Sequence, residues 1–356
     1  MRNIIVRTIT FQRTNNCGAA LQAFALESFL SSFCKDVAIV DYCPEWVEKN
    51  RNTFKSIIRR RSKKEILTLP ILIIRNGRFE SFVKNHCRLT EVVRSSDELI
   101  KKIQCDYFIV GSDQVWNPEI TGGFDNTYLL KIDSEAKRIS YAASCGLDDI
   151  KQDVILPIVD AINNFDAVSV RELSFENALK RNGAKNIITV LDPTFLLSAK
   201  EYRKIAKYYN FSNYVLIYTM HESEELRKIA KKIADKYNLK VLDTSKILKK
   251  WPADIVKRCV GPQQFLGLVD NASFVVTNSF HGTALSIVFR KDFYSMEAGN
   301  RSSRLISLLN EFNLSERFIE SASSLVNIST VNYSMVDKLI EEKCEQSRAF
   351  LLNNVV

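Results

Sequence analysis

A histidine stands at position 281, where a strand-like apolar run meets the first turn of an apolar helix, in SFVVTNSFHGTALSIVF (273–289). A core histidine would lie within an apolar face, whereas this one is surrounded by hydrogen-bonding groups. Imidazole transfers protons near neutral pH, and the free amides of a helix N-terminus attract anions. We therefore interpret His281 as a catalytic residue, and Asn278, Ser279 and Gly282 as substrate-binding residues, with Gly282 expected to begin the helix.

A second polar group follows a strand-like run in YFIVGSDQVWNP (107–118). Gly111 would let a ligand approach the backbone, and Ser112 could donate a hydrogen bond. Asp113 is a candidate to orient a sugar hydroxyl or to deprotonate it, although a helix N-cap is the plainer alternative. Trp116 could stack on a sugar ring or simply fill the core.

The stretch NNCGAALQAFAL (15–26) comes directly after the first apolar run. Asn16 and Gly18 suit a tight turn, and the helix that follows would direct its N-terminal amides at an anion. This is not the glycine pattern of a dinucleotide site. An ordinary strand-to-helix turn is the alternative to a binding role for Asn16 and Gly18.

Three arginines are candidates for binding anionic substrate groups. Arg171 ends the strand-like VSV run, where its planar fork could hold a carboxylate or phosphate; an ion pair with Glu172 or another acid is the structural alternative. Arg301 and Arg304 stand at the start of a helical pattern. Cations are disfavoured there by the helix dipole, which suggests that an anion is expected nearby.

These residues must be positioned by alternating strands and helices. The alternation favours parallel sheets covered on both faces, and the pattern restarts after residue 200, so we expect two doubly wound domains, 1–200 and 201–356. The expected strands are 3–11, 36–42, 105–112, 137–144, 165–170, 185–192, 213–220, 239–245 and 273–280. Ligands of such folds gather at the carboxyl ends of the strands.

Composition narrows the class of protein. A chain of 356 residues is long enough for two domains, and with 46% hydrophobic and 26% charged residues it is globular and not disordered. The eight cysteines show no paired spacing, which favours reduced thiols over a disulfide frame or zinc site. No metal-ligand cluster appears. The N-terminus lacks an export signal and no apolar run is long enough to span a bilayer, so we expect a cytoplasmic protein.

The net charge of +9 predicts an anionic partner. The segment 51–64 contains seven basic residues and no acid; the first acid after it is Glu65. Phe54, Ile57 and Ile58 share one helical face. A solvated helix and a patch that rests on an anionic membrane surface are both open. Nucleic acid is disfavoured, because no aromatic residues are interleaved as stacking platforms.

Taken together, the motifs NNCGAALQAFAL, GSDQVWNP, SYAASCG, SVRE, LDPTFLL, TNSFHGTALSIVF and NRSSRLISLL resemble, in this order, the polysaccharide pyruvyl transferase family over about residues 1–310. The resemblance implies an α/β fold of two Rossmann-like domains in a GT-B-like arrangement. It implies transfer of a pyruvyl group from phosphoenolpyruvate onto two hydroxyls of a sugar, forming a cyclic ketal. Phosphoenolpyruvate is then a co-substrate, and no other cofactor is implied.

The resemblance also implies roles for particular residues. His281 matches the family's histidine before a glycine and Arg171 its arginine in the VRE pattern, both associated with phosphoenolpyruvate. Some members carry a basic residue where this chain has Ser279, and Arg301 or Arg304 are candidates to replace it. The acceptor in the family is often a surface-polysaccharide precursor on a lipid carrier at the inner membrane face, which would place the enzyme peripherally on that membrane. The second domain is the expected donor side and the first the acceptor side.

Two other functions fit the same pattern. A GT-B-type glycosyltransferase would use a nucleotide sugar, and a non-catalytic binding protein of polysaccharide biosynthesis would keep only the scaffold. The three functions can be distinguished by whether phosphoenolpyruvate, a nucleotide sugar or neither stabilises the protein against unfolding.

Overall fold

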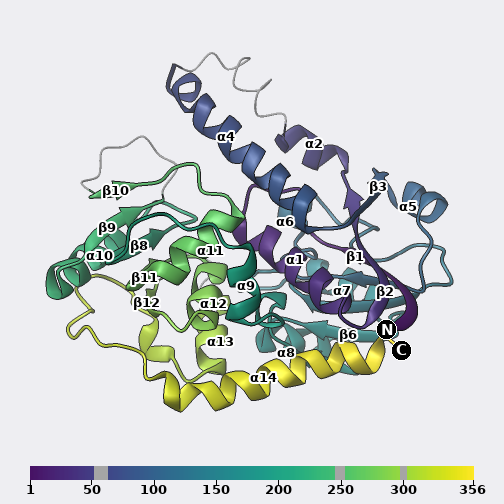
Figure 1. Cartoon of the computed structure of the whole chain (residues 1–356). Helices are drawn as coiled ribbons and strands as arrows, with labels where there is room; N and C mark the ends of the chain where they lie inside the picture. Colours follow the sequence, from purple (N-terminus) through teal and green to yellow (C-terminus); the bar gives the residue numbers. More distant parts are fainter. Residues whose placement is uncertain (52–62, 245–252, 297–302) are drawn as a thin grey trace. The chain divides into compact units, whose positions relative to one another are not determined.

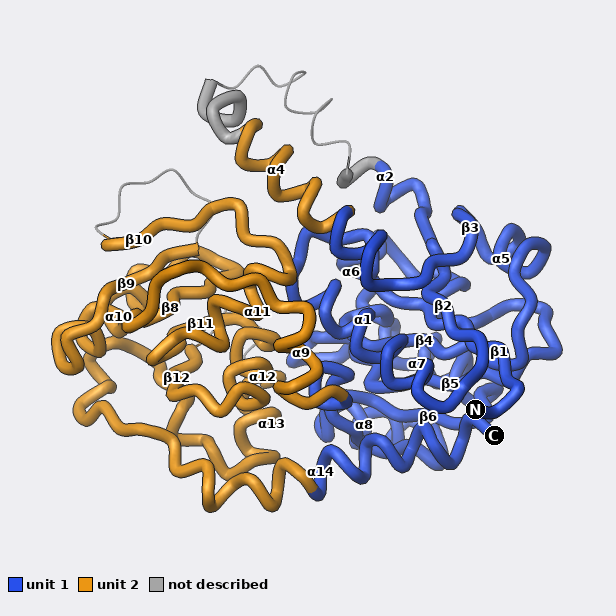
Figure 2. Tube along the Cα trace, viewed as in Figure 1, with its two compact units in different colours: residues 1–66, 81–196, 342–356 blue, residues 67–80, 197–341 orange. Residues whose placement is uncertain are grey.

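The computed structural model describes residues 1–51, 63–244, 253–296 and 303–356 (Figure 1). The chain divides into two compact units, coloured in Figure 2. Unit 1 comprises residues 1–66, 81–196 and 342–356, and unit 2 comprises 67–80 and 197–341. None of the helices in the described ranges is long and apolar enough to cross a lipid bilayer.

Unit 1 is built on a seven-stranded parallel sheet with the order β3-β2-β1-β4-β5-β6-β7. The strands are β1 (Arg2–Ile9), β2 (Cys34–Tyr42), β3 (Leu89–Val93), β4 (Tyr107–Val110), β5 (Lys137–Ala143), β6 (Ala167–Val170) and β7 (Ile187–Thr189). The helices are α1 (Cys17–Leu30), α2 (Glu45–Arg51), α5 (Ser96–Lys102), α6 (Pro118–Thr121), α7 (Gln152–Ile162), α8 (Leu173–Arg181) and the 3-10 turn η1 (Pro193–Phe195). The strand order reverses at β1, which is the switch point of a doubly wound fold.

Alternate residues of the central strands enter two separate cores. In β4, Phe108 and Val110 pack with residues of α7 and α8 on one face. Tyr107 and Ile109 pack with residues of α1 on the other face. Both faces of the sheet are therefore buried, as the continuous apolar runs of the sequence predict.

Unit 2 contains a five-stranded parallel sheet with the order β10-β9-β8-β11-β12. Its strands are β8 (Tyr214–Tyr218), β9 (Lys240–Asp243), β10 (Ile255–Val256), β11 (Phe274–Thr277) and β12 (Asp292–Ser295). Its helices are α9 (Ala199–Ile205), α10 (Glu224–Tyr237), α11 (Pro262–Asn271), α12 (Phe280–Val288), α13 (Ser303–Glu311) and the 3-10 turn η2 (Ser315–Arg317). Here the strand order reverses at β8, so the switch point lies between β8 and β11.

Helix α10 shows how the sequence encodes these elements. Ser223 caps its N-terminus by accepting a hydrogen bond from the Leu226 amide, and Asn238 ends it in the left-handed conformation. The buried side chains are spaced as one helical stripe: Leu226, Ile229, Ala230, Ile233 and Ala234. This stripe packs against Val215 and Ile217 of β8.

Two long helices contribute residues to both units: α4 (Lys63–His86), with Pro70 in its interior, and α14 (Tyr333–Asn354). The expected domain division at residue 200 must be corrected for the C-terminus. Residues 342–356 belong to unit 1, because Phe350, Leu351 and Val355 are buried in the unit 1 core. The hydroxyl of Ser347 also accepts a hydrogen bond from the Leu191 amide.

Candidate functional site

The turn after β4 carries Gly111, Ser112 and Asp113 at the carboxyl edge of the unit 1 sheet. The Gly111–Ser112 peptide is cis, and Gly111 has φ +113°. A Cβ on Gly111 would lie 2.3 Å from the carbonyl oxygen of Tyr141, so only glycine fits. Asp113 takes φ +68°, an uncommon conformation for a residue with a side chain.

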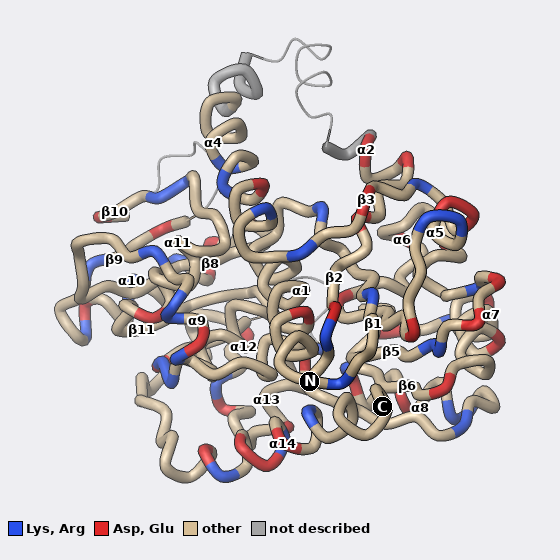
Figure 3. Tube along the Cα trace, turned by 45° about the vertical axis from the view of Figure 1, so that its right-hand side comes forward, with Lys and Arg blue, Asp and Glu red and all other residues tan. Residues whose placement is uncertain are grey.

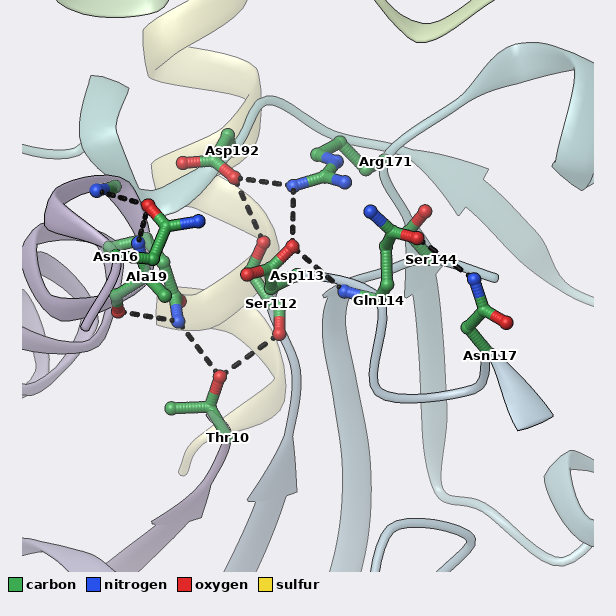
Figure 4. A network of polar contacts seen from close by, with 12 residues as sticks. Thr10, Asn16, Ala19, Ser112, Asp113, Gln114, Asn117, Ser144, Arg171 and Asp192 are labelled. Carbon is green, nitrogen blue, oxygen red and sulfur yellow. Dashed lines mark hydrogen bonds and ion pairs between the residues drawn. The ribbon is translucent and has the colours of Figure 1, made fainter. Parts of the chain in front are cut away.

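The hydroxyl and the carbonyl oxygen of Ser112 are both engaged by neighbouring elements (Figure 4). Its Oγ donates to Oδ2 of Asp192 at 3.0 Å, and its carbonyl oxygen accepts from Oγ1 of Thr10, which follows β1, at 3.0 Å. Asp192 is completely buried, and its Oδ1 accepts from the amide and hydroxyl of Thr194. The turn is therefore fixed by segments that follow β1 and β7.

Arg171 follows β6 with its side chain only 2% exposed. Its Nε donates to Oε1 of Glu172 at 2.9 Å, and its Nη1 donates to Oδ2 of Asp192 at 3.0 Å. The ion pair with Glu172, which the sequence allowed, is present. Burial lowers the pKa of Arg171, but the charges of Glu172, Asp192 and Asp113 raise it, so that the net pKa is raised.

Asp113 is the most exposed charged member of this cluster. Its side chain is 12% exposed, compared with 5% for Glu172 and 0% for Asp192. Oδ1 of Asp113 accepts from the Gln114 amide at 3.0 Å and lies 4.0 Å from Nη1 of Arg171. We call Asp113, Arg171, Glu172 and Asp192 the carboxylate cluster; it holds three acids and one base.

The alternatives for Asp113 and Trp116 can now be decided. Asp113 caps no helix, because α6 begins at Pro118 with Asn117 as its N-cap. Trp116 is 1% exposed, and its indole N–H donates to the carbonyl oxygen of Tyr128. Trp116 is therefore a core residue and not a surface platform for a sugar.

Asn16 caps α1: its Oδ1 accepts from the amides of Gly18 and Ala19 at 2.9 and 3.4 Å. Gly18 is the second residue of the helix and not part of a tight turn, so the expected need for its flexibility was wrong. Gln22 is fully buried and donates to Oγ1 of Thr10 at 2.8 Å. The Gln22–Thr10 bond supports the turn after β4, because Thr10 donates to the Ser112 carbonyl oxygen. The Asn16 oxygen occupies amides that an anion would otherwise use.

In unit 2, Thr277, Asn278 and Ser279 follow one another at the carboxyl end of β11. Oγ1 of Thr277 donates to the carbonyl oxygen of Tyr218 at 2.7 Å and accepts from the Ser279 amide at 3.0 Å. A Cβ on Gly282 would lie 2.4 Å from this same Oγ1, which explains the glycine. Close packing of the first turn of α12 on β11 thus depends on Thr277 and Gly282.

His281 is the second residue of α12 and is 5% exposed. The helix begins at Phe280 and not, as expected, at Gly282, because Ser279 provides the N-cap and accepts from the Gly282 amide. The Phe280 ring lies edge-on to the imidazole, with centroids 5.3 Å apart. His281 therefore lies within the first helical turn, at the carboxyl edge of the unit 2 sheet, and not in the middle of an apolar face.

Serine and threonine hydroxyls surround this helix start. Oγ1 of Thr283 donates to the Ser279 carbonyl oxygen and lies 2.6 Å from Oγ of Ser295, at the end of β12. Arg304 is half-buried at the second position of α13, a helix that packs against α12. Arg301 and the basic segment 52–62 lie outside the described residues.

Sequence reasoning found most of these positions but missed two. Asp192 was not among the predicted site residues, yet it accepts four hydrogen bonds. Ser144 was not predicted either, and its Oγ donates to Oε1 of Glu172 at 3.0 Å. An acid at the end of the apolar run IITVL, three residues after β7, was the available signal for Asp192. In the described part of the chain, no group of three or more His, Cys, Asp or Glu side chains is arranged to hold a metal ion.

The fold places the chain among two-domain α/β proteins of the GT-B-like class. A putative UDP-N-acetylglucosamine 2-epimerase from Listeria monocytogenes is similar, with TM-score 0.52, 8% identity, and 98% of this chain and 91% of that one covered. The enzyme of the same name from Neisseria meningitidis, bound to UDP-GlcNAc, gives TM-score 0.51 at 10% identity, covering 98% of each chain. At these identities the likeness shows the fold alone.

The sequence gives the family. The model of the polysaccharide pyruvyl transferase family matches residues 16–298, so this chain belongs to that family and is a transferase. No curated protein sequence matches the chain. Membership of this family supports a role in polysaccharide pyruvylation in general.

Proposed function

We propose that the protein transfers a pyruvyl group from phosphoenolpyruvate to two hydroxyls of a sugar in a surface polysaccharide or its lipid-linked precursor. The product is a cyclic ketal, and phosphate is released. The observation that most supports this proposal is the position of His281 in the first turn of α12, which follows the carboxyl end of β11 and also carries the hydroxyls of Ser279 and Thr283. Family membership supplies the reaction class.

Unit 2 is the proposed donor side. The α12 N-terminus provides the positive end of a helix dipole, which favours a carboxylate or phosphate. The polar residues described at this edge (Thr277, Asn278, Ser279, Thr283 and Ser295) carry no negative charge. Arg304 on the neighbouring helix α13, and Arg301 in the sequence, are candidates for further anion contacts.

Unit 1 is the proposed acceptor side. The carboxylate cluster holds three acids and one arginine, an excess of two acids, which disfavours an anionic donor and suits hydrogen-bond donation by sugar hydroxyls. Asp113 is the member that retains side-chain exposure. In this proposal it orients the attacking hydroxyl and accepts its proton.

The reaction needs proton movement at two centres. The C3 methylene of phosphoenolpyruvate gains a proton, one sugar oxygen bonds to C2, and the second sugar oxygen displaces phosphate from C2. Each hydroxyl gives up its proton as its oxygen bonds. We assign proton transfer at the donor to His281 and deprotonation of the acceptor to Asp113.

A lipid-linked acceptor would bring the enzyme to an anionic membrane face, and one described feature supports such docking. Helix α4 continues from the basic segment and exposes Ile73 by 53% and Ile74 by 51%. Basic residues also occur along α4 (Figure 3). Lys84 is exposed, whereas Arg78 is half-buried and donates to the carbonyl oxygen of Cys259. Apolar and basic groups on one helix are typical of peripheral membrane binding.

Donor choice tests the proposal. A ligand at about 100 times its dissociation constant stabilises a protein by roughly 2.7 kcal/mol. We expect phosphoenolpyruvate to raise the unfolding temperature and UDP-N-acetylglucosamine to leave it unchanged. Stabilisation by the nucleotide sugar alone would instead indicate a glycosyltransferase, and no response to either would remove the support for a donor site.

A further inference from the structure

Trp46 is the second residue of α2, and α2 begins three residues after β2 ends. The side chain therefore lies near the carboxyl edge of the unit 1 sheet. Trp116 is 1% exposed in the core, whereas Trp46 is partly exposed. Trp46 is thus a tryptophan of unit 1 whose ring a ligand can reach.

Buried rings hold the indole of Trp46 in place. It meets the ring of Phe11 edge-on, with centroids 5.9 Å apart and 82° between the planes. Phe11 meets Tyr128 in the same way at 5.2 Å, and Tyr128 meets Tyr42 at 5.3 Å. The hydroxyl of Tyr42 donates to Oδ2 of Asp125 at 2.8 Å, which fixes the far end of this series. A rigid aromatic side chain binds a ligand at a low cost in conformational entropy.

The same series leads toward the turn that carries Asp113. Strand β1 pairs with β2 on one side and with β4 on the other. Phe11 follows β1 directly after Thr10, and Oγ1 of Thr10 donates to the carbonyl oxygen of Ser112 at 3.0 Å. One short segment after β1 therefore contacts both Trp46 and the residue before Asp113.

Two polar atoms at this edge of unit 1 lack partners. Among the residues that the structure describes, Nε1 of Trp46 and Oγ1 of Thr14, in the loop after β1, are buried and make no hydrogen bond. Buried polar groups are nearly always hydrogen-bonded, so each exception calls for an explanation. A sugar hydroxyl both donates and accepts, and it could pair with either atom.

The charges near Trp46 favour a neutral ligand over an anion. Arg13, in the loop after β1, donates through Nε and Nη2 to both carboxylate oxygens of Asp41. The first turn of α2 carries two exposed acids, Glu45 and Glu48. An anion would meet these acids without an unpaired Arg13 to offset them. A neutral sugar ring pays no such penalty, and its C–H face matches the apolar face of an indole.

We propose that a sugar ring of the acceptor stacks on Trp46, and that this contact helps to select the acceptor and to hold it beside Asp113. The inference rests on the proposed pyruvyl transfer, and it names the binding subsite on the acceptor side. Trp46 takes no part in proton transfer. It acts on acceptor affinity.

The test compares Trp46→Phe and Trp46→Ala with the wild-type protein and with Tyr237→Ala. Tyr237 is 39% exposed at the end of α10, so its replacement removes an exposed aromatic ring from the other unit. The probe is acid-treated polysaccharide from the producing cell, from which existing ketals have been removed. Affinities for the probe and for phosphoenolpyruvate are measured by calorimetry, and turnover is measured with labelled phosphoenolpyruvate.

We expect Trp46→Ala to raise the Kd and KM for the probe roughly tenfold, the effect of truncating an aromatic anchor. Trp46→Phe should have a smaller effect, because it keeps a ring but loses the indole N–H. Phosphoenolpyruvate affinity, and kcat at saturating probe, should stay within about twofold of wild type in both variants. Tyr237→Ala should match wild type. Probe affinity unchanged in both Trp46 variants would overturn the inference.

Tryptophan emission of the wild-type protein gives a second measurement, which decides the matter if Trp46→Ala does not fold. The chain has three tryptophans, and Trp116 is buried. Saturating probe should change the emission of the wild-type protein, and Trp46→Phe should lose that change. Wild-type emission that does not respond would contradict stacking on Trp46. A response to UDP-N-acetylglucosamine and not to the probe would show that Trp46 stacks on a nucleotide base, and would also overturn the inference.

The proposed function can fail separately. If the wild-type protein binds the probe through Trp46 but transfers no label from phosphoenolpyruvate, the pyruvyl transfer is wrong and the sugar subsite stands. If the wild-type protein transfers label and the Trp46 variants bind the probe as wild type does, the subsite is wrong and the transfer stands.

Discussion

The side-chain oxygen of Asn278 accepts a hydrogen bond from the backbone amide of Met220 at 2.8 Å. The Nδ2 group of Asn278 donates to the carbonyl oxygen of His221, also at 2.8 Å. These bonds join the carboxyl ends of β8 and β11 at the switch point of unit 2. Asn278, expected from the sequence to bind substrate, has both ends of its amide on the loop after β8, and so fixes the turn that leads to His281.

Replacing Asn278 should therefore affect stability. Asn278→Ala removes both hydrogen bonds to the loop after β8, and at about 0.5–1.5 kcal/mol for each bond we expect a loss of about 1–3 kcal/mol in the free energy of unfolding. Urea denaturation measures it. Asn327→Ala, at an exposed position of unit 2, is the matched control. Equal stability of the two variants would show that the Asn278 bonds contribute nothing.

His281→Gln should fold normally and lose transfer activity. General acid–base groups typically contribute about 100- to 10,000-fold to a rate. The measurement is label transfer from phosphoenolpyruvate, with circular dichroism to check the fold. His221→Gln is the control, since His221 is exposed and the substitution is the same. Wild-type turnover in His281→Gln would remove the catalytic role.

Stability should depend on pH through Glu27, which is buried on α1. Burial, partly offset by Ser31 and Arg88, raises the pKa of Glu27 from 4.5 to about 7. Because the folded state holds this proton more tightly than the unfolded state, ionisation destabilises the fold as pH rises from about 4.5 to 7. The free energy of unfolding falls by at most about 3 kcal/mol, because a pKa difference of one corresponds to about 1.4 kcal/mol.

Glu27→Gln removes this ionisation. We expect the variant to be more stable than wild type above pH 7 and close to it near pH 4.5, in thermal unfolding followed across that range. Glu91→Gln, an exposed change of the same kind, is the control. A stability difference between Glu27→Gln and wild type that does not change with pH would contradict the prediction.

Membrane docking should depend on the basic segment and on salt. Replacing Arg59, Arg60, Arg61, Lys63 and Lys64 with Gln removes up to about 1 kcal/mol of attraction for each charge near an anionic leaflet. Co-sedimentation with vesicles containing phosphatidylglycerol should fall, while activity on a soluble acceptor persists. Ile73→Gln with Ile74→Gln should weaken sedimentation with less dependence on salt. Wild-type protein that does not sediment at low salt would exclude docking.

Much of the fold follows from the apolar pattern of the sequence. The nine expected strands all occur, because buried parallel strands are continuous runs of β-branched and aromatic residues. The edge strands β3, β10 and β12 were not expected. Leu89 and Val256, for example, are exposed, so the runs that contain them lack a clear apolar signal.

The candidate site was predictable in position but not in detail. Residues at strand ends meet at one edge of a parallel sheet, which brings Ser112, Asp113 and Arg171 together as their positions suggest. What each side chain contacts depends on residues distant in the sequence. Arg171 and Asp192 are separated by 21 positions and Ser112 and Asp192 by 80, and no local pattern encodes either pairing.

The central claim is transfer of a pyruvyl group from phosphoenolpyruvate to a sugar. The most direct measurement follows phosphoenolpyruvate carrying 13C at C2, incubated with the full-length protein and acid-treated polysaccharide from the producing cell. We predict a ketal carbon signal on the polysaccharide and release of one phosphate for each ketal formed, both absent with His281→Gln. Phosphoenolpyruvate that stays unchanged, while UDP-N-acetylglucosamine is consumed with the same acceptor, would contradict the account.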